Sequence, residues 1–207
     1  FDGIKVLGHE SLGSIEYKKI NNVQSIITVC IIGVLARHKG LDFVREVAKY
    51  IIKNKIKIKI KLIGYVEGGE IIEGLESTGR YDDDDLANLL NDINPTLIWF
   101  PAIWPETYSY TLTKAIESGL PIIAPKLGAF DERLKNYQIK KFATYPIDAS
   151  LVLASFYELL EMTKNNTIEK YNEPESEVST NYSAVMNDIK SNSKINKILL
   201  IPESDAN

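Results

Sequence analysis

Residues 96–128 constrain the fold of this chain more than any other stretch. They open with the apolar, strand-forming run TLIWF, which two prolines then prevent from continuing. A helix is expected to begin near residues 107–109, whose hydroxyl groups can cap free backbone N–H groups, and to end at Gly119. The apolar residues 122–124 after the next proline predict a second buried strand. A strand, a helix and a strand in this order predict a parallel unit.

The helix of this unit combines an apolar face with an N-terminus suited to an anion. Its apolar face has the spacing i, i+3, i+4 and i+7, with Leu112, Ala115, Ile116 and Gly119. The free N–H groups at Tyr108, Ser109 and Tyr110 are expected at the carboxyl edge of the sheet. Such groups bind phosphate, because a helix N-terminus carries partial positive charge.

An earlier part of the chain predicts a similar unit. The apolar run from Ser25 to Val34 is typical of a strand buried on both faces of a parallel sheet. It ends in the turn GVLARHKG, residues 33–40, and a helix follows with one apolar face: Val44, Val47, Ala48, Ile51 and Ile52. A strand, a glycine-containing turn and a helix begin a doubly wound fold, so we predict a Rossmann-like α/β domain with helices on both faces of a parallel sheet.

The turn after the first strand carries a candidate anion site. Arg37 and Lys39 place two cations beside a helix N-terminus, the arrangement that neutralises a diphosphate. The alternative interpretation is an ordinary basic surface loop. His38 lies between the two cations, and we expect it to be solvated rather than a ligand or a base.

The remaining segments predict further α/β elements. Strict alternation of Lys and Ile over residues 55–62 indicates a strand near an edge of the sheet, with a solvated lysine face. Residues 67–77 are interpreted as a short helix on a surface loop. Four aspartates, residues 82–85, precede an apolar helix, and we interpret them as a helix cap rather than a metal site. Later elements are a short helix at 130–134, a strand at 141–145 and an amphipathic helix at 147–162.

The expected organisation is one domain with two flanking segments. Residues 1–24 are interpreted as a linker or the tail of a preceding domain, and residues 25–165 as the Rossmann-like domain. Residues 166–207 are interpreted as a linker, a short helix at 182–190 and the possible start of a further unit at 195–202. Because the chain begins without Met, we expect it to be a fragment of a longer protein.

Composition restricts the classes of function that this chain can have. The chain of 207 residues is 44% hydrophobic and 25% charged, which is typical of a globular domain. Its net charge of −4 argues against a nucleic-acid partner. Cys30 is the single cysteine, so no internal disulfide forms, which suits a reducing cytosol. No apolar run approaches the ~18 residues of a transmembrane segment. We therefore expect a cytoplasmic protein, either free or, in the full-length chain, at the inner face of the membrane.

The segment PETYSYTL…AIESGLPIIAPKLGAFDER resembles the C-terminal, donor-binding half of GT-B glycosyltransferases, in the large retaining family (group 1) that includes glycogen and sucrose synthases. Its pattern is a glutamate, seven residues, a second glutamate, small residues, Gly-Leu-Pro, a strand and a Gly-Gly-x-x-Glu-like loop. Glu106 stands at the first glutamate, and residues 119–121 supply Gly-Leu-Pro. Gly128 and Glu132 fit the last loop.

The resemblance covers about residues 25–165 and implies a hexosyltransferase-like enzyme. It implies transfer of a sugar from a UDP- or GDP-sugar donor substrate to a glycan or lipid-linked acceptor, in the biosynthesis of a surface or cell-wall polysaccharide. The family precedent requires no metal, and we expect no other cofactor. The acceptor would bind through a missing N-terminal domain, so we expect this fragment alone to be inactive.

The resemblance also implies roles for individual residues. Glu106 would lie near the transferring sugar as the catalytic residue. The diphosphate would bind Lys39 and the N–H groups at Tyr108, Ser109 and Tyr110. Arg37 would share part of that role, since Val34 stands where the family has an arginine. The donor cleft would be lined by Gly33 and Gly64, and the nucleobase would lie near Arg80 and Tyr81.

One departure limits the functional prediction. Lys114 stands at the second glutamate, which in the family accepts hydrogen bonds from both ribose hydroxyls. An ammonium group only donates hydrogen bonds, so Lys114 cannot take this role. Three interpretations stay open: Lys114 serves another donor or contact, it pairs with Glu106 or Glu117 and weakens the site, or the domain is a non-catalytic glycosyltransferase-like module that binds nucleotide or glycan.

Overall fold

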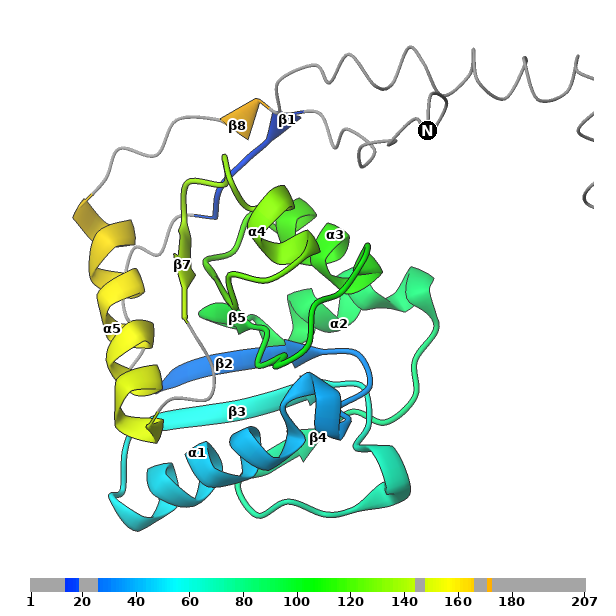
Figure 1. Ribbon diagram of the computed structural model, residues 1–207, viewed down its shortest axis with the longest axis vertical. Coiled ribbons are helices and arrows are strands. Elements are labelled where there is room, and N and C mark those ends of the chain that lie inside the picture. The colour runs from blue at the N-terminus through cyan, green and yellow to red at the C-terminus, as the bar shows by residue number, and fades with distance from the viewer. Residues whose placement is uncertain (1–13, 19–25, 144–147, 166–170, 173–207) are drawn as a thin grey trace, which may run out of the picture. The chain divides into compact units, whose positions relative to one another are not determined.

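A computed structural model describes residues 14–18, 26–143, 148–165 and 171–172, which all belong to one compact unit (Figure 1). The short helix predicted at 182–190 and the strand predicted at 195–202 lie outside the described residues, as do most of residues 1–24. Within the described part of the chain, no helix has the length and apolar character needed to cross a membrane.

The centre of the unit is a six-stranded sheet in which every pair of neighbouring strands is parallel. Its strands are β2 (Ile27–Ile32), β3 (Ile58–Ile63), β4 (Leu75–Ser77), β5 (Leu97–Trp99), β6 (Ile122–Ala124) and β7 (Lys140–Phe142). Their order across the sheet is β4-β3-β2-β5-β6-β7. This order is that of a doubly wound Rossmann sheet, which confirms the predicted fold class. The direction of winding reverses between β2 and β5.

Helices cover both faces of the sheet. They are α1 (Leu41–Lys53), α2 (Leu86–Ile93), α3 (Tyr110–Glu117), α4 (Ala129–Arg133) and α5 (Ala149–Asn165). Buried side chains of α1 and α5 join one hydrophobic cluster, and those of α2, α3 and α4 join a second cluster on the opposite face. The alternating side chains of β2 divide between the clusters, with Val29 in the first and Cys30 in the second.

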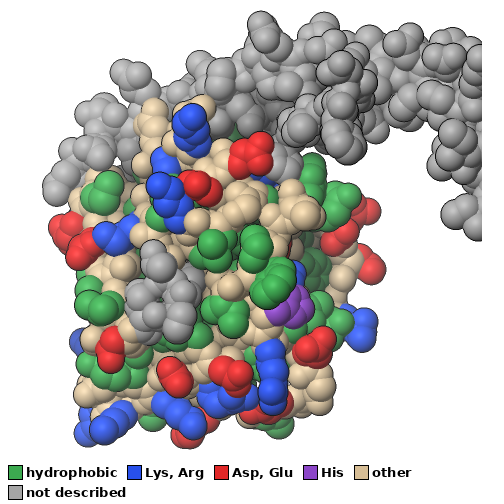
Figure 2. Space-filling model, viewed as in Figure 1, with side chains coloured by type: hydrophobic (Ala, Val, Ile, Leu, Met, Phe, Trp, Pro, Cys, Tyr) green, Lys and Arg blue, Asp and Glu red, His purple; other side chains and the backbone are tan. Residues whose placement is uncertain are grey.

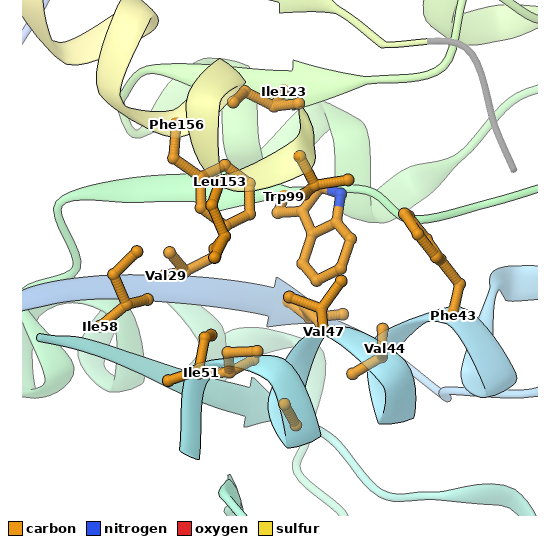
Figure 3. Close-up of a cluster of buried hydrophobic side chains, with 14 of the residues drawn as sticks. Val29, Phe43, Val44, Val47, Ile51, Ile58, Trp99, Ile123, Leu153 and Phe156 are labelled. Carbon is orange, nitrogen blue, oxygen red and sulfur yellow. The ribbon is translucent and has the colours of Figure 1, made fainter. Parts of the chain in front are cut away.

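Trp99 on β5 occupies the middle of the first cluster (Figure 3). Its ring meets Phe43 of α1 edge to face at 5.8 Å between centroids, and Phe156 of α5 at 5.4 Å. Leu153 of α5 points into the same space (Figure 3). The amphipathic helix predicted at residues 147–162 is therefore confirmed as α5, which packs its apolar face on the sheet beside α1.

Several local predictions need correction. Ile52, expected on the buried face of the first helix, is 42% exposed because it lies at the margin of that face. Residues 67–77 hold only a 3₁₀ turn, Glu67–Gly69, and then the edge strand β4 rather than a helix. By contrast, the strand predicted near an edge of the sheet from residues 55–62 is confirmed as β3, which lies next to the edge strand β4.

The four aspartates lie where the helix prediction placed them but do not cap it through their side chains. Asp83–Asp85 form a 3₁₀ turn that leads directly into α2, and neither Asp82 nor Asp85 makes a side-chain cap hydrogen bond. Their charge still lies at the positive end of the helix dipole. Among the described residues, no three His, Cys, Asp or Glu side chains are grouped as a metal site would require.

Part of the segment interpreted as a linker packs against the unit. β1 (Ser14–Ile15) pairs antiparallel with β8 (Tyr171–Asn172), and Ile15 is buried in the second cluster. Tyr17 meets the buried Tyr137 edge to face at 5.1 Å between ring centroids. Such a short strand has no periodic pattern, so its sequence gave no signal. The domain boundaries themselves stay a prediction.

Candidate functional site

A pocket opens at the carboxyl edge of the sheet, where the loops after β2 and β5 meet. The chain winds in opposite directions on the two sides of β2 and β5, so the pocket lies at the point where the strand order reverses. Doubly wound sheets bind their ligands at this position. The pocket is lined by His38, Lys39, Trp104, Pro105, Glu106, Thr107, Tyr108, Ser109, Tyr110 and Thr111. Hydrophobic side chains gather beside the exposed histidine on this face (Figure 2).

A charged pair lies in this pocket. Lys39 Nζ lies 3.3 Å from Glu106 Oε1, and both side chains are partly exposed, at 36% and 21%. Lys39 ends the 3₁₀ turn Arg37–Lys39 after β2, and Glu106 belongs to the loop after β5. The structure therefore brings together a predicted phosphate-binding cation and the predicted catalytic carboxylate. The pairing holds both groups in the pocket while leaving them accessible to a ligand.

Two glycines allow close backbone approach behind this pocket. Gly64 ends β3 with a φ of +138°, and a Cβ atom there would lie 1.9 Å from the carbonyl oxygen of Gly33. Gly33 has a φ of +102°, and its own Cβ would lie 3.3 Å from Thr111 in the first turn of α3. Only glycine fits this approach, because any side chain at residue 64 would clash with backbone. The backbone that follows β2 thus lies between the end of β3 and Thr111 of α3.

The turn before α3 is strained and is held by a buried arginine. Ser109, which precedes the helix, has a φ of +63°, an uncommon conformation for a residue with a side chain. Arg133 of α4 is only 9% exposed, and its guanidinium donates hydrogen bonds to the carbonyl oxygens of Tyr108 and Ser109, each at 3.1 Å. It also donates to Thr113 Oγ1 at 2.8 Å and lies over the Tyr108 ring at 5.0 Å.

This turn differs from the expected one in its cap. Ser109 makes no side-chain cap hydrogen bond, so the predicted hydroxyl cap is wrong there. Its carbonyl oxygen instead accepts the first bonds of the helix, from the N–H groups of Leu112 and Thr113. The amides of Tyr110 and Thr111 precede these bonds at the N-terminus of α3, and both residues line the pocket. Sequence reasoning missed Arg133, because a lone arginine in a short polar helix gives no sign of burial.

The loop that begins α4 contacts the backbone of the predicted catalytic residue. The N–H of Ala129 donates to the carbonyl oxygen of Glu106 at 2.8 Å. A Cβ atom on Gly128 would lie 2.5 Å from that same oxygen. Glu132, which the resemblance also placed in this loop, is exposed on α4 and lines a different hollow with Gly128. The loop therefore positions Glu106 through backbone contacts.

Three other predicted site residues lie outside the lining of this pocket. Arg37 is exposed in the turn beside Lys39. Arg80 is exposed and lies over the ring of Tyr65 at 4.4 Å. Lys114 lines a separate groove of about 490 Å³ between α2 and α3, together with Asp83, Asp84 and Glu117.

Lys114 pairs within its own helix. Its Nζ donates to Glu117 Oε2 at 2.9 Å, and this hydrogen bond raises the pKa of the Lys114 amine. Glu106 is instead paired with Lys39. Of the two partners considered for Lys114 from the sequence, the structure therefore shows Glu117, which lies one helical turn away.

Solved structures of other proteins share the fold of this chain. One similar structure is the C-terminal domain of a glycosyl transferase group 1 family protein, LpcC from Francisella tularensis. The match covers 68% of this chain and 81% of the LpcC chain, at 16% sequence identity and a TM-score of 0.51. HepE from Anabaena, in complex with UDP, matches 81% of this chain at 14% identity and a TM-score of 0.52. A third similar structure is the catalytic domain of Arabidopsis thaliana starch synthase IV bound to ADP and acarbose. The match covers 82% of this chain and 38% of the synthase chain, at 15% sequence identity and a TM-score of 0.51.

These matches establish the fold that the sequence resemblance predicted. The described part of the chain has the fold of the C-terminal domain of a GT-B glycosyltransferase. The match spans about half of HepE, 49% of its length. No protein-family model and no curated protein sequence matches this chain.

Proposed function

We propose that this domain binds the donor of a glycosyltransferase, a nucleotide diphosphate sugar. The whole enzyme would transfer the sugar to a glycan or lipid-linked acceptor in polysaccharide biosynthesis. The observation that carries the proposal is the pair of Lys39 and Glu106 at 3.3 Å, beside the N-terminus of α3 at the switch point of the sheet. HepE, a protein of the same fold, is known in complex with UDP and in complex with UDP and glucose.

The chemistry of the pocket supports a diphosphate. The Lys39 ammonium and the first amides of α3 supply positive charge from two separate elements, and together they would stabilise the charge that develops on the departing nucleotide. Glu106 would lie near the transferred sugar, where its carboxylate accepts hydrogen bonds from hydroxyl groups. No metal is required for this arrangement, since cationic and backbone groups supply the neutralising charge.

Calorimetric titration of the chain with UDP and with GDP tests the proposal. We expect one of the two nucleotides to bind, and Lys39→Met to weaken that binding by about tenfold or more, since a charge-assisted phosphate contact is lost. Lys49→Met, which removes an exposed lysine on α1, is the matched control and should leave affinity unchanged. Binding that is equally insensitive to both substitutions would contradict the proposed site.

A second function is favoured by the pair of Lys114 and Glu117 at 2.9 Å. In this alternative the domain is a non-catalytic module, because an ammonium replaces the ribose-binding carboxylate and ties up the neighbouring one. Lys114→Glu distinguishes the two functions. Gain of nucleotide binding only in this variant, beside no binding by the wild type and by Lys114→Gln, would support the non-catalytic module.

A further inference from the structure

We propose that Trp104 and Tyr110 form an aromatic platform that binds a pyranose ring at the mouth of this pocket. This inference deepens the proposed function and rests on it, since it assigns a saccharide contact to the same site. It adds two side chains that neither the motif nor the charges of the pocket singled out for this role.

The exposure of these rings is unusual. Trp104 is 67% exposed and Tyr110 79% exposed, whereas the second tryptophan, Trp99, is completely buried. Aromatic side chains this large contribute most to stability when buried, so their exposure on a pocket is typical of a binding surface. Ile103, the residue before Trp104, is also exposed, at 47%.

Backbone contacts hold the platform in place before any ligand binds. The N–H of Ile103 donates to the carbonyl oxygen of His38 at 3.2 Å, and the carbonyl of Glu106 accepts from Ala129. Trp104 therefore lies on a short segment that is anchored at both ends. Preorganisation of this kind favours binding, because less conformational entropy is lost when the ligand arrives.

Tyr110 is supported from behind by a series of contacts. Its ring packs on that of Tyr108 at 4.6 Å between centroids, with an interplanar angle of 52°. The Tyr108 ring lies over the buried guanidinium of Arg133. The exposed ring is thus connected to a rigid part of the fold, although its own surface remains open to solvent.

The mixture of groups in the pocket matches a sugar ring. The faces of a pyranose present C–H groups with partial positive charge, which are attracted to the negative face of an aromatic ring. Its hydroxyl groups need donors and acceptors around the rim. The same pocket supplies the Glu106 carboxylate, the Lys39 ammonium and the hydroxyls of Thr107, Ser109 and Thr111. A wholly apolar ligand would leave the Lys39–Glu106 pair desolvated, at a cost in free energy.

Acrylamide quenching of tryptophan fluorescence tests the inference on the intact chain. Of its two tryptophans, only Trp104 is accessible to the quencher, because Trp99 is completely buried. UDP-glucose, GDP-mannose and maltoheptaose are the probes, with UDP and GDP as matched ligands that lack the sugar. We expect at least one saccharide probe to reduce the quenching constant by about twofold, since a stacked ring covers one face of the indole.

The choice of probes separates the two sources of a pyranose. Protection by a nucleotide sugar beyond that of its nucleotide assigns the platform to the donor sugar, whereas protection by maltoheptaose assigns it to a glycan acceptor. By calorimetry, Tyr110→Ala should weaken the protecting saccharide about tenfold, the size of one lost aromatic contact. Tyr157→Ala, which removes an exposed ring from α5, is the control and should have no effect.

Each remaining outcome decides against one proposal. Binding of UDP or GDP through Lys39 without protection of Trp104 by any saccharide overturns the platform and leaves the donor site standing. Protection by UDP equal to that by UDP-glucose overturns the assignment to a sugar, since the stacked ring would then be the base. Protection by maltoheptaose without any nucleotide binding supports the platform and contradicts the proposed donor site.

Discussion

Arg133→Met is the substitution that most directly tests how the candidate site is held together. Arg133 donates three hydrogen bonds: two to the carbonyls of the strained turn at Tyr108 and Ser109, and one to Thr113 on α3. Hydrogen bonds to charged groups contribute about 1.5–3 kcal/mol each. Their loss is partly offset, because burying the guanidinium itself costs free energy and methionine fills much of the space. We expect unfolding to require about 2–4 kcal/mol less free energy than in the wild type.

Urea unfolding followed by the fluorescence of the buried Trp99 measures this loss. Hydrogen exchange should show faster exchange of the Leu112 and Thr113 amides in the variant, since their acceptor, the Ser109 carbonyl oxygen, loses the support of Arg133. Arg45→Met is the control: Arg45 pairs with Asp42 and Glu70 on the surface and should leave the unfolding midpoint close to the wild type. A loss below about 1 kcal/mol for Arg133→Met, or unchanged exchange in α3, would refute its role as the clamp of this turn.

Two further substitutions test the packing of the sheet edge and the titration of the core. Gly40→Ala should destabilise the chain by about 2–4 kcal/mol in urea unfolding, because φ is +86° and the new Cβ would lie 2.1 Å from the Pro101 carbonyl oxygen. Gly68→Ala, with a φ of +79° but open space around it, should cost only about 1 kcal/mol, and equal losses would contradict the steric explanation. Burial raises the pKa of the Cys30 thiol to about 12, so the folded state keeps a proton that the unfolded chain releases. The contribution of the protonated Cys30 thiol to folding stability is complete below about pH 9 and is lost as the pH rises toward 12. The free energy of unfolding should therefore fall less steeply with pH in Cys30→Ala than in the wild type between about pH 9 and 11. Identical slopes in the two proteins would exclude Cys30 as a source of the pH dependence.

The order of the α/β units was predictable because its signals are local. Apolar runs gave β2, β5 and β6, and helical spacing gave the buried faces of α1, α3 and α5. The motif around Glu106 resembles that of GT-B glycosyltransferases, and this resemblance implied the fold. β4 was missed, since three residues at the edge of a sheet require neither burial nor a period.

The candidate site depended on tertiary structure. Lys39 and Glu106 meet only because β2 and β5 are neighbours at the point where the winding of the sheet reverses. Arg133 is buried only because the turn before α3 offers carbonyl groups to a residue far along the chain. The pairing of Lys114 was one of two alternatives, and the structure shows the local one, Glu117.

Apart from the short strands β1 and β4, the sequence by itself thus determined the succession of strands and helices and the kind of sheet they form, because periodicity, proline and glycine act over a few residues. Only the tertiary structure decided which charges meet, which arginine is buried and which aromatic rings stay exposed on the pocket. Those properties depend on the distances between loops that are remote in sequence, and strand order alone brings such loops together.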